Sequence, residues 1–195
     1  LPDETLLSKN IIGKVVLITG AGGSIGSELC RQVIARSPKK LIMVELNELA
    51  LFNIQQALSN YSDRIISVLG SISDDPLMEE LLINESVDSV YHAAAYKHVP
   101  LVEDINNITK ACENNVIGTF NLASVSVLYQ VESFVMISTD KAVRPSNVMG
   151  ASKRMAEMVI QSIDTQSLST KFSMVRFGNV INSSGSVIPL FLDQI

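Results

Sequence analysis

The chain has 195 residues, of which 47% are hydrophobic and 18% are charged, which is enough apolar material for one sizeable globular core. Its formal net charge of -5 argues against a general binder of nucleic-acid phosphates, because such proteins usually carry a basic face. No uncharged apolar run approaches the roughly 20 residues that span a bilayer, so this segment is expected to be soluble.

Short hydrophobic runs alternate with longer segments of helical periodicity, which is the pattern of βα units in a parallel sheet. Strands rich in Val and Ile, covered by helices on both faces, are expected at residues 14–19, 41–45, 65–70, 87–94, 133–139 and 172–180. Helices are expected at residues 24–36, 47–59, 76–83, 102–128 and 146–163. The sequence therefore predicts an α/β fold with a doubly wound parallel sheet of the Rossmann type over residues 14–195, preceded by a leading arm over residues 1–13.

The first expected strand runs into the sequence TGAGGSIG, whose glycines Gly20, Gly23 and Gly26 are spaced by three residues. Glycines here let the backbone turn tightly and approach a pyrophosphate, whose charge is stabilised by the N-terminus of the next helix. Ser24 is expected to cap that helix, and Ile25 completes the turn. Since the glycines stand between a strand and a helix, they indicate a dinucleotide site, and the lack of a Gly-Lys-Ser/Thr sequence excludes a P-loop.

The second expected strand ends in Glu45, at the position where a dinucleotide fold binds the hydroxyls of the adenosine ribose. No Arg or Lys follows within several residues to accept a 2′-phosphate, so NAD is favoured over NADP. Glu48 remains an alternative for this acid. After the third strand, Ser71 and Ile72 are the residues expected on the adenine side.

The fourth expected strand runs into HAAAYKHVP, where Ala93, Ala94 and Ala95 leave room for the cofactor to lie across the strand end. Ligands of open α/β sheets bind at the carboxyl ends of the strands. Lys97 is therefore expected to bind a phosphate or a sugar hydroxyl, and His98 is a second candidate for substrate binding.

Other residues that often bind metals are expected to be structural. His92 lies inside the fourth strand and is expected to face the interior. Cys30 and Cys112 fall within helical patterns rather than at metal-ligand spacing, so we expect buried free thiols in a reducing compartment. No metal site is predicted.

Several motifs resemble a known family: VYHAAAYKHVPLVE, NNVIGTFNLA, STDKAV followed by NVMGASK, and VRFGNV followed by SSGSVIPLF. They are similar to the extended short-chain dehydrogenase/reductase superfamily, and specifically to the nucleotide-sugar 4,6-dehydratases of bacterial polysaccharide biosynthesis of the CapD type. Those enzymes act on UDP-N-acetylglucosamine. The resemblance covers nearly the whole chain from Lys14 onward.

This resemblance implies an NAD cofactor, a UDP-sugar substrate, a homo-oligomer and no nucleic-acid partner. It also implies transmembrane helices and another domain upstream, and the rest of a sugar-binding lobe downstream. The full-length protein would then work at the cytoplasmic side of the bacterial inner membrane.

In most relatives, a tyrosine four residues before the equivalent of Lys153 takes the proton from the sugar hydroxyl during oxidation. Met149 stands at that position here and carries no titratable proton. The large members of the family are themselves recognised by Met at this position, so the resemblance does not imply a disabled site. Lys153 lies on the same helical face as Met149 and matches the family's lysine, which also contacts the cofactor.

The reaction implied by the resemblance oxidises carbon 4, eliminates water across carbons 5 and 6, and returns the hydride to carbon 6. Asp140 and Lys141 match the elimination pair, with Asp140 as the acid and Lys141 as the base. A lysine is a base at neutral pH only where desolvation or nearby positive charge favours its neutral form. Thr139 would bind the hydroxyl being oxidised, and either Asp140 or Lys153 would accept its proton.

Residues after the sixth strand match the family's substrate side. Asn179 resembles the residue that touches the substrate diphosphate, and Ser184, Ser186 and Val187 lead toward the nucleotide. Asn115 is expected to tie its helix to the strand ends rather than to contact substrate.

Two other functions remain open. A nucleotide-sugar 4-epimerase would share the oxidation step but would not need an Asp-Lys elimination pair. A non-catalytic NAD-binding scaffold would have no use for Asp140, Lys141 and Lys153 together.

Overall fold

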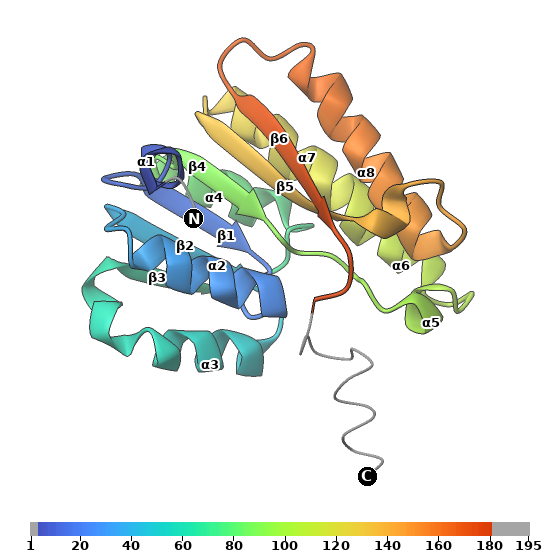
Figure 1. The fold of residues 1–195 in the computed structure, drawn as a ribbon, viewed down its shortest axis with the longest axis horizontal. Helices are drawn as coiled ribbons and strands as arrows, with labels where there is room; N and C mark the ends of the chain where they lie inside the picture. The colour runs from blue at the N-terminus through green and yellow to red at the C-terminus, as the bar shows by residue number, and fades with distance from the viewer. Residues whose placement is uncertain (1–3, 181–195) are drawn as a thin grey trace.

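The structure is a computed structural model that describes residues 4–180, and it contains a sheet of six parallel strands (Figure 1). Their spatial order is β3-β2-β1-β4-β5-β6, the strand order of the Rossmann fold, which confirms the predicted doubly wound α/β class. The strands are β1 (Val15–Thr19), β2 (Lys40–Glu45), β3 (Ile65–Leu69), β4 (Ser89–His92), β5 (Ser133–Thr139) and β6 (Lys171–Phe177).

Helices cover the sheet in two layers: α2 and α3 pack on one face, and α4, α7 and α8 lie on the other (Figure 1). Within residues 4–180, none of the helices combines the length and the apolar character that a membrane span requires. The α-helices are α1 (Glu4–Lys9), α2 (Ser24–Ile34), α3 (Glu48–Ala57), α4 (Asp75–Glu85), α5 (Val99–Val102), α6 (Ile108–Cys112), α7 (Gly118–Leu128) and α8 (Val148–Asp164). The other helical turns are η1 (Ser59–Arg64), the π turn η2 (Glu113–Ile117) and η3 (Asp140–Ala142).

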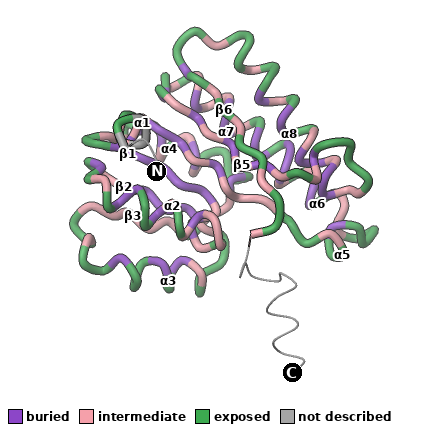
Figure 2. Tube along the Cα trace, viewed as in Figure 1, coloured by how far each residue is buried: buried purple, intermediate pink, exposed green. Residues whose placement is uncertain are grey.

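The centre of the sheet is buried on both faces, as the sequence predicted. Val15 and Leu17 of β1 pack into a hydrophobic cluster with α4, α7 and α8, whereas Val16 and Ile18 pack into a second cluster with α2 and α3. Because successive residues of a strand point to opposite faces, one apolar run supplies both clusters. Figure 2 shows β1 and β2 in the colour of buried residues.

Strand β6, at one edge of the sheet, departs from the prediction that the strands are buried on both faces. Phe172 and Met174 of β6 pack toward the cluster that includes α8, but Ser173 and Val175 point to the other face, where Val175 is 42% exposed. The helices of that face, α2 and α3, contact β1, β2 and β3, and none of the described residues covers the same face of β6. The prediction of burial on both faces is therefore wrong for β6, because it lies at the edge of the sheet that the described residues form, and β3 at the opposite edge is also at most half-buried.

Two strands end earlier than predicted. β4 stops at His92 instead of continuing to residue 94, and β6 stops at Phe177 instead of continuing to residue 180. The residues that follow each strand leave the sheet and line the cleft described below. The predicted strands were thus too long because their last residues line the cleft instead of pairing in the sheet.

The long helix expected over residues 102–128 is broken. Helix α5 ends at Val102, and regular helix resumes only at Ile108. Asp104 accepts hydrogen bonds from the backbone and side-chain nitrogens of Asn106, and the Asn107 side chain donates to the carbonyl oxygen of Leu101. These side chains satisfy local polar groups outside a helix, so the chain turns there.

The two smaller expectations have mixed outcomes. The leading arm contains the short helix α1 and reaches the sheet, because Oγ of Ser89 donates a 2.9 Å hydrogen bond to the carbonyl oxygen of Asn10. Cys30 is a buried free thiol as predicted, and burial raises its pKa to about 12. Cys112 is also a free thiol, but it is only half-buried because it lies at the junction of α6 and η2.

Candidate active site

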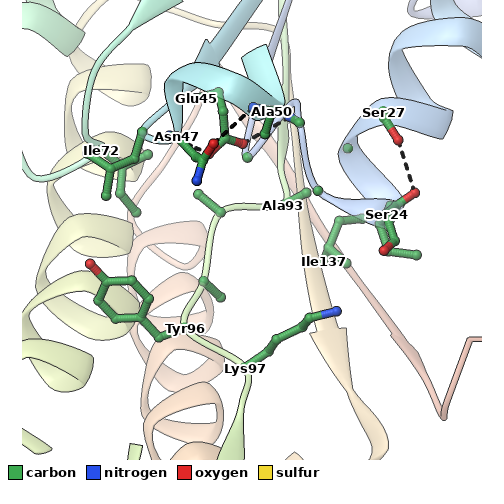
Figure 3. A pocket seen from close by; sticks show the side chains of 18 of the residues that line it. Ser24, Ser27, Glu45, Asn47, Ala50, Ile72, Ala93, Tyr96, Lys97 and Ile137 are labelled. Carbon is green, nitrogen blue, oxygen red and sulfur yellow. Dashed lines mark hydrogen bonds between the residues drawn. The ribbon is translucent and has the colours of Figure 1, made fainter. Parts of the chain in front are cut away.

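The carboxyl ends of the strands open into a cleft of about 1120 Å³ (Figure 3). Among the described residues, the ones predicted to bind cofactor or substrate line this cleft, and so do the predicted catalytic residues other than Asp140. The first group comprises Gly20, Gly23, Ser24, Ile25, Gly26, Glu45, Ser71, Ile72, Ala93, Ala94, Ala95, Lys97, His98, Lys153 and Asn179. The catalytic group comprises Thr139, Lys141, Met149 and Lys153.

The glycine turn connects β1 to α2. Gly20 has a φ of +65°, and a Cβ atom there would lie 2.7 Å from the backbone nitrogen of Ala94. A Cβ on Gly26 would collide with the carbonyl oxygen of Gly20, so glycine is required at both ends of the turn. Gly23, rather than the expected Ser24, is the N-cap of α2, because Ser24 is already the first helical residue.

Glu45 ends β2 and holds the glycine turn from the side. One of its carboxylate oxygens accepts a 2.9 Å hydrogen bond from the backbone N–H of Gly22, and the other accepts a 3.0 Å bond from the N–H of Asn47. Asn47 in turn caps α3, since its side-chain oxygen accepts from the N–H of Ala50 (Figure 3). These bonds fix the carboxylate at the edge of the cleft.

The end of β3 contributes a short turn beside Glu45. The side-chain oxygen of Ser71 accepts a 3.1 Å hydrogen bond from the backbone N–H of Ser73, which orders this turn. Ile72 is buried between the turn and α7 and presents an apolar surface to the cleft. An apolar side chain here suits a flat, uncharged ring better than a phosphate.

His92 is structural, as predicted. Thr119 donates its hydroxyl proton to the carbonyl oxygen of Asn115 (2.8 Å), so Nε2 of His92 donates to Thr119 (2.9 Å) and Nδ1 accepts from the Thr19 hydroxyl (2.8 Å). Burial and, to a smaller extent, the nearby charge of Lys153 lower the pKa of His92 to about 3. This neutral ring and the Thr19 hydroxyl, which accepts from the N–H of Ala94, hold the alanine segment in place.

Asn115 ties a helix to a strand end, as predicted. Its side-chain oxygen accepts from the N–H of Tyr96, and its side-chain nitrogen donates to the carbonyl oxygen of Tyr96 and to Oγ of Ser152. The loop after β4 is therefore fixed to α8 next to Lys153. Lys97 and His98 follow Tyr96 on this loop and are exposed at the rim of the cleft.

The sequence Thr139-Asp140-Lys141 forms the end of β5 and the start of η3. Oγ1 of Thr139 donates to Oδ1 of Asp140 (3.1 Å), and Nζ of Lys141 lies 3.4 Å from the same oxygen. Lys141 also donates a 3.1 Å hydrogen bond to Oδ1 of Asn179, which follows β6. The hydrogen bond from Thr139 and then the charge of Lys141 lower the pKa of Asp140, so its carboxylate is ionised at neutral pH.

Met149 and Lys153 lie one helical turn apart near the start of α8. Met149 is 4% exposed and packs against Val102 and Ala111, so it fills space and supplies no proton. Lys153 is 5% exposed, and burial lowers its pKa to about 8, although the negative charge of Glu157 acts in the opposite direction. Lys153 is thus more easily deprotonated than an ordinary lysine.

Sequence reasoning missed some residues that line the cleft. Asn114 lies in the π turn and donates from its side chain to Asn115, while Tyr96, Arg31 and Asn47 also border the cavity. Asn47 could have been found as the helix cap that follows Glu45, but no sequence signal marks a π turn. Ser184, Ser186 and Val187 lie outside the described residues.

Among the residues that the structure describes, no group of three or more His, Cys, Asp or Glu side chains could hold a metal ion. The titratable side chains at this end of the cleft include Lys141 and Lys153, and Asp140 contacts Lys141 beside it.

Comparison with known proteins identifies the family. A family model described as polysaccharide biosynthesis protein matches residues 16–195. The chain belongs to this polysaccharide biosynthesis protein family. It is 50% identical to the capsular polysaccharide biosynthesis protein CapD of Staphylococcus aureus over 99% of this chain and 32% of that protein, which confirms the predicted resemblance.

Other relatives are also covered only in part. The chain is 47% identical to the probable polysaccharide biosynthesis protein EpsC of Bacillus subtilis, again over 99% of this chain and 32% of that protein. It is also 35% identical to a UDP-glucose 4-epimerase of Rickettsia canadensis, over 94% of this chain and 54% of that protein. The chain thus spans about a third to a half of the length of these curated relatives.

Solved structures agree with the family assignment. The structure of Pen from Bacillus thuringiensis has a TM-score of 0.89 and 34% identity, and the match covers 95% of this chain and 58% of that one. A second structure is that of DesIV, a dTDP-glucose 4,6-dehydratase from Streptomyces venezuelae crystallised with NAD and TYD. It has a TM-score of 0.78 and 25% identity, and the match covers 92% of this chain and 61% of the DesIV chain. The family's fold is thus that of extended short-chain dehydrogenase/reductases.

Proposed function

We propose that the chain is the NAD-binding catalytic core of a 4,6-dehydratase that converts UDP-N-acetylglucosamine to a UDP-4-keto-6-deoxy sugar for surface polysaccharide synthesis. The observation that carries the proposal is the ammonium of Lys141, which lies between Asp140 and Asn179 at the cleft that also contains Thr139 and Lys153. The similarity to CapD and to a dTDP-glucose 4,6-dehydratase supports it.

The cleft residues fit NAD. The glycine turn brings the backbone at the N-terminus of α2 to the cleft, where a pyrophosphate would be stabilised, and the fixed carboxylate of Glu45 would accept hydrogen bonds from the ribose. Ile72 and the three alanines would border the adenine and the rest of the cofactor, and the NAD bound by DesIV supports this placement. Bound NAD would supply the site with a reversible hydride acceptor.

The contacts at the end of β5 suggest how a proton moves. Thr139 would bind the sugar hydroxyl at carbon 4, and its own hydroxyl already donates to the ionised carboxylate of Asp140. Asp140 would therefore accept the hydroxyl proton through Thr139 during oxidation. It would later donate that proton to the hydroxyl leaving from carbon 6, so that water departs.

Lys141 would first release a proton to solvent, and its neutral amine, beside Asp140 at the cleft, would then take the proton from carbon 5 in the elimination. Lys153 would contact the cofactor, and Met149 would fill the space that a tyrosine occupies in other members. Lys97, His98 and Asn179 would bind the UDP-sugar. Oligomerisation and attachment of the full-length protein to the cytoplasmic side of the inner membrane belong to the same proposal.

The decisive experiment is to incubate full-length protein with UDP-N-acetylglucosamine, and to determine the mass of the recovered sugar nucleotide and its configuration at carbon 4 by NMR. Loss of one water supports the dehydratase. The 35% identity to a UDP-glucose 4-epimerase supports a second candidate, an epimerase, whose product would keep the substrate's mass. Absence of any product from a protein that binds NAD would contradict both and favour a non-catalytic scaffold.

A further inference from the structure

Glu157 is a charged residue in the interior, outside the cleft. It lies on α8 one helical turn after Lys153, and its side chain is 0% exposed. An ionised carboxylate buried in this way is unfavourable unless hydrogen bonds and opposite charges compensate for the lost water.

The structure provides that compensation completely. Oε1 accepts hydrogen bonds from Oγ of Ser138 (2.6 Å) and Nε of Arg176 (2.7 Å), while Oε2 accepts from Nη2 of Arg176 (2.6 Å) and Nη1 of Arg154 (3.0 Å). Burial raises the pKa of Glu157, but the bonds from Arg176, Ser138 and Arg154 more than offset this and lower it to about 2. The carboxylate is therefore charged and fully bonded at neutral pH.

These bonds join three elements that each carry part of the site. Ser138 and Arg176 are paired in the register of β5 and β6, and the next pair is Thr139 with Phe177. Both strands end at this pair. Lys141 follows β5 in η3 and Asn179 follows β6, and the side chains of those two residues form a 3.1 Å hydrogen bond. One carboxylate on α8 is thus bonded to residues that directly precede Thr139 in β5 and Phe177 in β6.

We propose that Glu157 is a positioning residue, which keeps α8, β5 and β6 in the register that the reaction requires without itself touching substrate or cofactor. This inference rests on the proposed function for its effect on turnover. Its structural part, the coupling of residues 139–141 and 177–179 to α8, is independent of which sugar reacts.

The test compares Glu157→Gln with Arg154→Met in the NAD-bound, full-length protein. Glutamine keeps the shape but turns an amide N–H₂ toward arginine donors, so the bidentate bond to Arg176 is lost. Arg154 lies on the same helix as Glu157, so its removal leaves the bonds to both strands in place. Ser138→Ala, which removes a single bond to β5, is a milder variant to use if Glu157→Gln does not fold.

Turnover per NAD-bound site should fall on the order of 10- to 100-fold in Glu157→Gln and by a smaller factor in Ser138→Ala, with KM for the UDP-sugar within about threefold of the unmutated value. In Arg154→Met, both the turnover per NAD-bound site and the KM should stay within about threefold of the values for the unmutated protein. A purely structural ion pair would lower the folded fraction but leave kcat per NAD-bound site unchanged, and that result overturns the inference.

Amide hydrogen exchange provides a readout that does not depend on turnover. Exchange at residues 139–141 and 177–179 should be at least about tenfold faster in Glu157→Gln than in Arg154→Met. If the unmutated protein does not convert the sugar, the proposed function fails, while this exchange pattern still tests the positioning. Equal exchange in the two variants overturns the inference whatever the substrate.

Discussion

The side chain of Lys141 donates a 3.1 Å hydrogen bond to that of Asn179, which lies 38 residues later in the chain. This bond joins the ends of β5 and β6 across the mouth of the cleft. Since Asp140 contacts the same ammonium, the amine is held in place by two groups before any substrate arrives. A pre-positioned amine needs little rearrangement to reach a proton on a bound sugar.

Replacing Lys141 should separate oxidation from elimination. Lys141→Met removes the proposed base, so product formation should fall on the order of 10²- to 10⁴-fold and solvent deuterium should no longer enter carbon 5. Met149→Leu keeps the apolar bulk packed against Val102 and Ala111, so its rate of product formation should fall by less than about tenfold. Product mass, cofactor absorbance and deuterium content are measured together. An inactive Met149→Leu beside a normal Lys141→Met would show that the acid-base groups lie elsewhere.

Glu45 should control the choice of cofactor. Its fixed carboxylate would accept hydrogen bonds from ribose hydroxyls and repel a 2′-phosphate, so the unmutated protein should bind NAD at least about tenfold more tightly than NADP. Glu45→Ala should narrow that ratio, measured as two dissociation constants by calorimetry. Glu48→Ala, at the other candidate acid, is the matched control and should keep the ratio. Equal affinities in the unmutated protein contradict the assignment.

Removing the buried charge of Lys153 should stabilise the fold. Burial lowers the pKa of Lys153 from 10.5 to about 8, so at pH 7 the folded state holds an ammonium that is better solvated in the unfolded chain. Lys153→Met should raise the free energy of unfolding by up to about 3 kcal/mol at pH 7 in the absence of cofactor, while abolishing turnover.

The pH dependence gives the sign of this effect. Between about pH 8 and 10.5 the unfolded chain binds more protons at Lys153 than the folded one, so stability rises with pH in that window. Urea unfolding at several pH values should show that the advantage of Lys153→Met shrinks as pH rises. Lys97→Met, at an exposed lysine, is the control. If the free energies of unfolding of Lys153→Met and the unmutated protein differed by a constant amount from pH 8 to 10.5, the burial of the charge would be contradicted.

His92 should make the fold sensitive to acid. Its pKa is about 3 in the folded state, against 6.5 ordinarily, so its contribution to stability is present above pH 6.5 and is lost as pH falls toward 3. Each pKa unit corresponds to about 1.4 kcal/mol, so the loss reaches several kcal/mol. Urea unfolding between pH 7 and 4 should show a shallower decline in His92→Gln. His98→Gln should keep the original slope, since His98 is exposed; matching slopes for the two variants would contradict this role.

The fold and the cofactor side of the cleft could be predicted because their signals are local. The glycine spacing, the acid at Glu45 and the apolar strands each depend on a few consecutive residues. The break in the predicted helix after Val102 could not be predicted, because it depends on side-chain hydrogen bonds of Asp104 and Asn107 that compete with helix formation. The exposure of one face of β6 depends on whether a helix packs against that face, and the residues of the strand itself do not indicate this.

The catalytic side was only partly predictable. The sequence placed Thr139, Asp140 and Lys141 at the strand end but gave no means of seeing that Lys141 contacts Asn179. Glu157 shows the same limit, because its partners Ser138 and Arg176 come from two other elements. A buried glutamate within a helical pattern has no local signature, and only the sheet register brings its partners together.

The strand order divides the site between two halves of the chain. The glycine turn, Glu45 and Ser71 lie at the ends of β1, β2 and β3. Thr139, Lys141 and Asn179 lie at the ends of β5 and β6, on the other side of β4. Substitutions in separate regions usually have additive effects. A substitution near Thr139 or Lys141 should therefore leave the glycine turn and Glu45 undisturbed. A chimera that joins the first half of this chain to the second half of a relative should therefore be joined near β4.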